Sequence, residues 1–132
     1  MRRSRRLRVF VVEDSEIVRT RLVALLAETR GVELAGEAAN VADALVGMPA
    51  GRPDAVLVDL RLPDGDGFDV IRAAKTMTPT PVVVVLTSYA YPQLQAQGLA
   101  AGADWFLDKS TEFQRLPEIL TSLQRVPQAR MP

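Results

Sequence analysis

The sequence contains no cysteine and no histidine. Without cysteine the chain has no disulfide framework and no thiolate metal site. Without histidine it has no Ser-His-Asp triad, no imidazole metal ligand and no site for its own phosphohistidine. No apolar stretch approaches the roughly 18 residues of a membrane span. The first arginines lead to no signal-peptide core, because Glu13, Asp14 and Glu16 follow closely. We therefore expect a soluble cytoplasmic protein without membrane contacts.

An excess of charge of either sign is also missing. The 132 residues include 16 Lys and Arg against 16 Asp and Glu, which gives no reason to expect nucleic-acid binding. Residues 1–6 are locally basic, and we expect them to form a solvated tail. A hydrophobic content of 48% is enough for the core of one domain, which we assign to residues 7–126, followed by a tail over residues 127–132.

Five short apolar runs alternate with amphipathic segments. We expect one helix that is capped by Ser15 and ends at Gly31, and another that is capped by Asn40 and ends at Pro49. We expect the last helix to begin at about residue 116, because Pro117 cannot lie in a helix interior. Other helices are expected over residues 67–75 and 92–101. The strands are expected over residues 7–12, 32–38, 55–58, 81–86 and 105–107. This alternation predicts an α/β fold, a doubly wound five-stranded parallel sheet with helices on both faces.

Three of these strands end in polar side chains. The first is followed by Glu13 and Asp14, the third by Asp59, and the fourth by Thr87 and Ser88. The carboxyl ends of parallel strands line one crevice, so these groups should meet there. At an effective dielectric constant of about 20, two carboxylates roughly 4 Å apart repel by about 4 kcal/mol. A hard divalent cation such as Mg²⁺ relieves this repulsion.

The positions of these residues resemble those in receiver domains of bacterial response regulators, the chemotaxis-type single-domain receivers of two-component signalling. The resemblance covers about residues 7–125 and implies a flavodoxin-like sheet with strand order 2-1-3-4-5. The residues that carry it are Glu13, Asp14, Asp59, Leu62, Pro63, Gly67, Thr87 and Lys109.

The resemblance implies a phosphoryl-transfer site that depends on Mg²⁺. Asp59 would be the nucleophile that becomes phosphorylated. Glu13, Asp14, Asp59 and the backbone carbonyl of Arg61 would bind the metal ion. Lys109 and the ion would neutralise charge on the transferred phosphoryl group.

A second set of residues would sense the phosphoryl group. Thr87 and the backbone N–H of Ser88 would hydrogen-bond its oxygens, and Thr87 would move toward it. Phe106 would follow that movement by packing alone, since it has no hydroxyl; it could equally be an ordinary core residue. Arg61 and Tyr89 lie where the family tunes the lifetime of the phosphoryl group, and their bulk favours a long one.

The loop after the lysine departs from the family pattern. Ser110 stands where the family usually has proline, and a cis bond before a non-proline residue costs about 3 kcal/mol. We therefore expect a trans peptide or a reshaped loop after Lys109. Asp64 and Asp66 lack the remaining ligands of a calcium loop, so we expect them to stabilise a turn.

These features favour a stand-alone receiver that is not itself an enzyme. A histidine kinase or phosphotransfer protein would phosphorylate Asp59. The signal would pass to a downstream protein through the fourth helix, fifth strand and fifth helix, or the phosphoryl group would move on in a relay. Residues 89–103 carry no charge, so the fourth helix is either a partner or homodimer surface or a neutral solvated face.

Other interpretations remain open at this point. The chain could be a receiver excised from a larger DNA-binding transcription regulator, or a degenerate receiver that binds partners without phosphorylation. A Mg²⁺-dependent phosphohydrolase of the haloacid-dehalogenase kind is disfavoured, because Arg61 stands where that family needs a second aspartate. A flavodoxin-like nucleotide binder is disfavoured by the acidic loop over residues 13–15.

Overall fold

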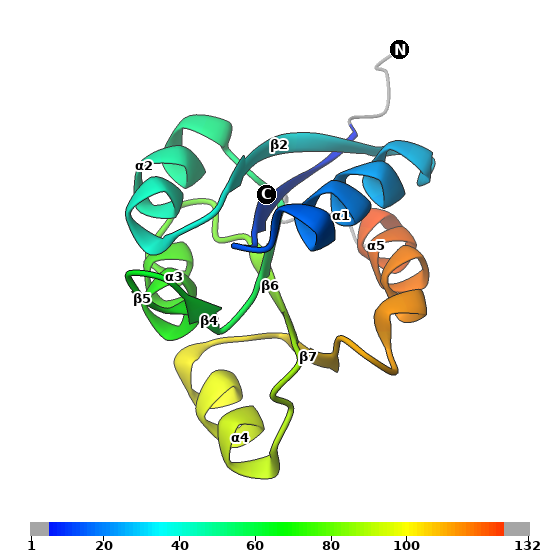
Figure 1. Cartoon of the computed structure of the whole chain (residues 1–132). Helices are drawn as coiled ribbons and strands as arrows, with labels where there is room; N and C mark the ends of the chain where they lie inside the picture. Colours follow the sequence, from blue (N-terminus) through cyan, green and yellow to red (C-terminus); the bar gives the residue numbers. More distant parts are fainter. Residues whose placement is uncertain (1–5, 126–132) are drawn as a thin grey trace.

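The computed structural model describes residues 6–125, and the two predicted tails fall almost entirely outside this range. One parallel sheet has the order β2-β1-β3-β6-β7, which confirms the order predicted from the resemblance (Figure 1). Its strands are β1 (Leu7–Val12), β2 (Val32–Ala38), β3 (Ala55–Val58), β6 (Val82–Thr87) and β7 (Trp105–Asp108). A small antiparallel pair, β4 (Arg61–Leu62) and β5 (Gly65–Asp66), was not expected from the sequence.

Helices cover both faces of the sheet, as predicted. In Figure 1 α1 and α5 lie on one side of the strands, and α2 and α3 lie on the other. Their bounds are α1 (Glu16–Glu28), α2 (Val41–Gly51), α3 (Gly67–Lys75), α4 (Pro92–Ala101), a short 3-10 helix η1 (Phe113–Arg115) and α5 (Leu116–Arg125). No helix within residues 6–125 is long and apolar enough to cross a membrane.

Alternation along the central strands divides the core into two layers. Val9 and Val11 face α1 and α5, whereas Phe10 and Val12 face the layer that includes α2 and α3. The Phe10 ring packs so closely that a Cβ on Gly36 of β2 would lie only 2.7 Å from it. Strand β2 can approach the ring at this point because glycine has no side chain.

Several helix termini follow the predicted local rules. Ser15 caps α1 by accepting a hydrogen bond from the Val18 N–H, and Asn40 caps α2 by accepting one from the Asp43 N–H. The last helix, α5, begins at Leu116, as predicted, directly after η1. These signals were readable because each involves residues only a few positions apart.

Two predicted helix ends are wrong. Helix α1 ends at Glu28 rather than Gly31, because the Thr29 hydroxyl donates to the Leu25 carbonyl and the Thr29 N–H to that of Leu26. Helix α2 continues through Pro49 to Gly51. A proline in the last turn removes one helical hydrogen bond, and the close packing of Gly51 against the backbone of β2 keeps that turn in place.

Candidate functional site

An acidic cluster lies at the carboxyl ends of β1 and β3. The backbone pairing runs one residue past each strand, since the Glu13 N–H donates to the Ala38 carbonyl of β2 and the Asp59 N–H donates to the Val12 carbonyl of β1, both at 3.0 Å. This pairing brings Glu13, Asp14 and Asp59 together, with one carboxylate oxygen of each within 4.8 Å of the others. Glu13 is 2% exposed and Asp59 is 7% exposed, whereas Asp14 faces solvent. Repulsion between these groups must therefore be offset locally.

Lys109 supplies a positive charge to this cluster. Its ammonium nitrogen lies 2.8 Å from Glu13 Oε1 and 3.1 Å from Asp59 Oδ2. Burial by itself would lower the pKa of Lys109, but the hydrogen bond to Glu13 and the charge of Asp59 outweigh it, so the pKa is raised. The lysine therefore stays charged at neutral pH.

One ammonium does not balance three carboxylates. Burial raises the pKa of Glu13 despite hydrogen bonds from Lys109 and the Ser15 N–H. The charges sum to minus two (three carboxylates, one ammonium) if all are ionised, which a divalent cation would neutralise. Oxygen ligands from carboxylates are those that Mg²⁺ prefers. The donor set is thus suited to a hard divalent ion.

The loop after β1 is held by a residue that the sequence analysis did not single out. Arg19 of α1 donates to the backbone carbonyl of Glu13 at 2.9 Å and forms an ion pair with Glu37 of β2 at 3.1 Å. The contact holds in place the backbone that carries Glu13 and Asp14. No local sequence pattern predicts this role of Arg19, because its two partners lie six and eighteen residues away.

The turn between β4 and β5 is attached to α2. The two carboxylate oxygens of Asp64 accept hydrogen bonds from the N–H groups of Val41 and Ala42 at 2.7 and 3.0 Å. These bonds, first that from Val41, lower the pKa of Asp64. Asp66 caps α3 by accepting from the Phe68 N–H at 3.0 Å. Both aspartates therefore stabilise the turn and its neighbours, as expected.

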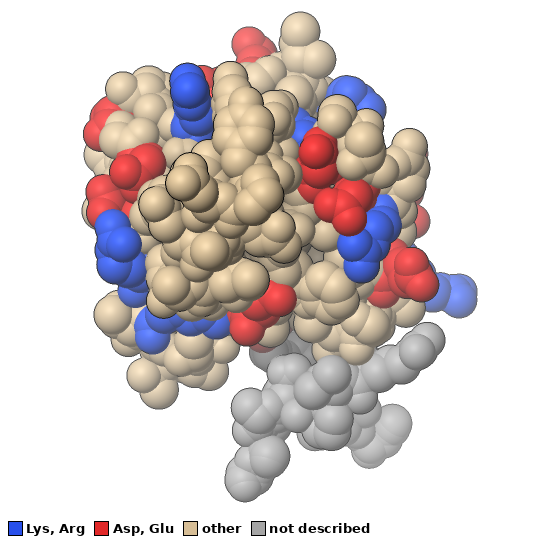
Figure 2. Space-filling model, turned by 90° about the horizontal axis from the view of Figure 1, so that it is seen from below, with Lys and Arg blue, Asp and Glu red and all other residues tan. Residues whose placement is uncertain are grey.

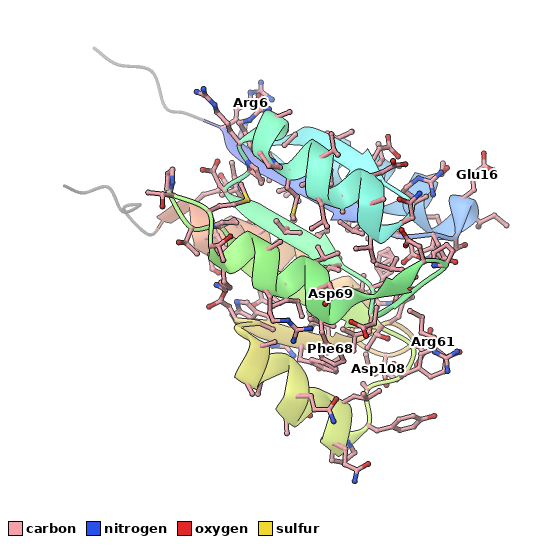
Figure 3. All side chains as sticks on the ribbon, turned by 90° about the vertical axis from the view of Figure 1, so that its left-hand side faces the viewer. Arg6, Glu16, Arg61, Phe68, Asp69 and Asp108 are labelled. Carbon is pink, nitrogen blue, oxygen red and sulfur yellow. The ribbon has the colours of Figure 1, made fainter. Side chains whose placement is uncertain are left out.

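The guanidinium group of Arg61 stacks on the ring of Tyr89. The guanidinium carbon of Arg61 lies 4.3 Å from the centroid of the Tyr89 ring. Figure 3 shows Arg61 at the same end of the molecule as Glu16, the first residue of α1. The Arg61 N–H approaches Asp59 Oδ1 at 3.5 Å, so the backbone of Arg61 runs beside the acidic cluster. A cation over an aromatic ring is an attractive arrangement.

The two hydroxyl residues after β6 differ in environment. Thr87 is fully buried, its Oγ1 accepts from the Tyr89 N–H at 3.2 Å, and its carbonyl accepts from the Lys109 N–H at 2.8 Å. Ser88 is exposed. Thr87 is thus linked by hydrogen bonds to both the Tyr89 loop and the Lys109 loop.

Phe106 of β7 is half-buried beneath α4. A Cβ on Gly98 would lie 2.8 Å from its ring, so α4 can approach β7 only with glycine there. Figure 3 shows Phe68 of α3 in the region between α3 and α4, and Phe68 packs against the same core cluster as Phe106. The contacts suit a core residue and also a residue whose movement would displace α4.

The surface over α4 is uncharged. Figure 2 views the molecule from this side and shows uncharged side chains across the centre, with Lys, Arg, Asp and Glu around them. Tyr91 is 60% exposed and Leu99 is 47% exposed. A neutral face is less costly to remove from water than a charged one.

Residues 9–121 match the family model described as the response regulator receiver domain. The chain is 37% identical over 109 residues to the DNA-binding transcriptional activator DevR/DosR of Mycobacterium tuberculosis, covering 83% of this chain and 50% of that protein. It is 35% identical over 125 residues to the sensory transduction protein LytT of Bacillus cereus, covering 95% of this chain and 50% of that protein.

A solved structure gives the same result for the fold. The signal receiver domain of NarL from Mycobacterium tuberculosis matches with a TM-score of 0.83 at 28% identity, covering 92% of this chain and 98% of that one. The chain spans about half the length of the two curated relatives named above.

Proposed function

The chain belongs to the response regulator receiver domain family of two-component signalling, and from this premise we propose that Asp59 accepts a phosphoryl group. The observation that carries the proposal is the position of the Lys109 ammonium, 2.8 Å from Glu13 and 3.1 Å from Asp59. The donor would be a phosphohistidine on a histidine kinase or phosphotransfer protein. No catalytic activity on other molecules is proposed for this chain.

The transfer is a substitution at phosphorus. One carboxylate oxygen of Asp59 attacks, the bond from phosphorus to the donor's imidazole nitrogen breaks, and that nitrogen keeps the electron pair. Bound Mg²⁺ would stabilise negative charge on the phosphoryl oxygens. The Lys109 ammonium, already beside the Asp59 carboxylate, can reach one of those oxygens without leaving the site.

We assign the metal to the acidic cluster. Glu13, Asp14 and Asp59 would each contribute a carboxylate oxygen, and Arg61 would contribute its backbone carbonyl. Support comes from the excess of negative charge at the cluster and from the burial of Glu13 and Asp59. Arg19 and Asp64 would keep the two ligand-bearing loops in place.

We further propose that phosphorylation reaches other proteins through α4, β7 and α5. Thr87 and the Ser88 N–H would bind the phosphoryl oxygens, and the shift of Thr87 would loosen the packing of Phe106 against Gly98 of α4. The uncharged surface over α4 would contact a downstream protein or a second copy of the chain. That the protein acts in the cytoplasm, and that it acts as a stand-alone receiver, are predictions from the sequence.

The direct test is the intact mass of the protein after incubation with acetyl phosphate and Mg²⁺. We expect one phosphoryl adduct on the wild type and none on Asp59→Ala. Asp69→Ala is a matched control, because Asp69 is an exposed carboxylate of α3 outside the site. No adduct on the wild type, or an adduct that persists in Asp59→Ala, would overturn the proposal. Trp105 fluorescence, followed in the same samples, reports whether β7 responds.

A further inference from the structure

The side chain of Lys109 is too flexible to fix the position of its own ammonium group. A lysine has a flexible stem of four carbons, and fixing it in one conformation costs rotamer entropy. Its ammonium nevertheless lies within hydrogen-bonding distance of two carboxylates that follow two different strands. The lysine backbone must therefore be set accurately by the loop that carries it.

That loop is closed by the two residues on either side of the lysine. Asp108 Oδ1 accepts two hydrogen bonds from Ser110, one from its N–H at 2.8 Å and one from its hydroxyl at 2.6 Å. A carboxylate that accepts from the N–H two residues ahead forms an Asx turn, which reverses the chain locally. Lys109 is the central residue of this turn.

The turn is attached at both ends. On the sheet side, Asp108 pairs in register with Thr87, and the Lys109 N–H donates to the Thr87 carbonyl at 2.8 Å. On the helix side, Glu112 Oε1 accepts from the Asp108 N–H at 2.8 Å, and the Glu112 N–H donates back to the Asp108 carbonyl at 2.8 Å. The bond between Lys109 and Ser110 is trans, as predicted, since Thr78–Pro79 is the one cis peptide within residues 6–125.

We infer that Asp108 and Ser110 are positioning residues that hold Lys109 against Glu13 and Asp59, so that this chain sets its lysine by side-chain hydrogen bonds rather than by a proline ring. The inference deepens the proposed function, on which its role in phosphorylation rests. Hydrogen bonds from Ser110 also keep the pKa of Asp108 below its usual range, consistent with a carboxylate engaged in the turn. In Figure 3 Asp108 lies at the end of β7.

The chain allows a test that needs no phosphorylation, because it contains just two lysines, Lys75 and Lys109. Lys75 is ion-paired with Asp104 at 2.7 Å, away from the site, and serves as the internal reference. Trace acetylation with acetic anhydride, read by peptide mass spectrometry, gives the labelling rate of Lys109 relative to Lys75. We expect Asp108→Ala to raise this ratio several-fold with the rate at Lys75 unchanged.

Two further variants grade the effect and guard against misfolding. Asp108→Asn should raise the ratio less than Asp108→Ala, because its amide oxygen still accepts hydrogen bonds. Ser110→Ala should also have a smaller effect, because it removes the hydroxyl donor and keeps the N–H. A ratio that stays at the wild-type value in both Asp108→Ala and Ser110→Ala would overturn the inference. A rise in labelling at both lysines would indicate general opening, and would overturn it also.

A double-mutant cycle then tests the role in phosphorylation. Asp108→Ala should slow adduct formation from acetyl phosphate several-fold while leaving the affinity for Mg²⁺ unchanged. On a Lys109→Ala background the same change should have no further effect, because the group it positions is gone. Equal slowing on both backgrounds would assign Asp108 a general structural role and contradict the inference. If the wild type forms no adduct, the proposed function fails, and the labelling ratio still decides the positioning role.

Discussion

A single ammonium group lies between two carboxylates that are almost completely buried. Lys109 contacts Glu13 and Asp59, residues that lie 96 and 50 positions away in the chain. Removing it would leave both acids buried without a cation, which is costly. These three residues thus decide the local stability of the site and, under the proposed function, would also hold the phosphoryl group.

At the residue scale, the stack of Arg61 on Tyr89 predicts a slow loss of the phosphoryl group. The two side chains would hinder water from approaching Asp59, and their attraction is worth about 0.5–1 kcal/mol at an exposed position. We expect Arg61→Ala and Tyr89→Ala each to speed autodephosphorylation several-fold, measured as decay of the phosphoryl adduct. The double variant should be little faster than either, since each removes the stack.

Arg72→Ala provides the matched control for this prediction. Arg72 is an exposed arginine on α3 that pairs with Asp69, so its loss should leave the decay rate unchanged. Decay rates in Arg61→Ala and Tyr89→Ala that equal the wild-type rate would count against a shielding role.

At the element scale, the β4–β5 turn and helix α2 stabilise each other through Asp64. The helix begins with backbone N–H groups that have no partner within the helix, and Asp64 accepts hydrogen bonds from two of them. A carboxylate at this end also interacts favourably with the helix dipole. The contact joins a loop beside the site to a helix 23 residues earlier in the chain.

This contact predicts a pH-dependent stability difference. The pKa of Asp64 is lowered from its ordinary value of 3.8, so its contribution is present above about pH 3.8 and is lost as the pH falls through the folded-state pKa. We expect Asp64→Asn to lower the free energy of unfolding in urea at neutral pH. That difference should shrink below pH 3.8. A difference independent of pH would contradict the assignment, and Asp69→Asn, at an exposed site, is the control.

At the scale of the whole molecule, the sheet brings together the acidic residues that follow β1 and β3, at the carboxyl ends of these strands. Folding brings these charges together and therefore works against their repulsion. The hydrophobic layers on both faces of the sheet hold the strand ends in place in spite of it. A ligand that binds only the folded cluster must then stabilise the whole domain.

We therefore predict that Mg²⁺ raises the melting temperature. At a Mg²⁺ concentration of about 100 times Kd the gain is about 2.7 kcal/mol, or roughly 10 °C for a domain of this size. Asp14→Asn should reduce the rise, and because Asp14 is exposed the change leaves no cavity. Asp69→Asn should keep the full rise. Thermal denaturation with and without Mg²⁺ measures the change in melting temperature. An unchanged melting temperature of the wild type would contradict the metal site.

The sequence by itself determined the elements and the end of the sheet at which the acids lie. Alternating apolar runs, the caps Ser15 and Asn40, and the polar residues directly after three of the strands act over a few positions, so they can be read locally. The predicted end of α2 at Pro49 was wrong, because the helix continues to Gly51, where it lies close against the backbone of β2. There a distant contact decided against a local rule.

Only the tertiary structure decided which groups touch. The pairing of Lys109 with Glu13, the attachment of Asp64 to α2 and the stack of Arg61 on Tyr89 join segments far apart in the sequence. The hydrogen-bonded turn of Asp108 and Ser110 is local, but its effect depends on the position that the fold gives to Lys109 between them. Such contacts depend on strand register and helix packing, which are properties of the folded chain as a whole and not of any short segment.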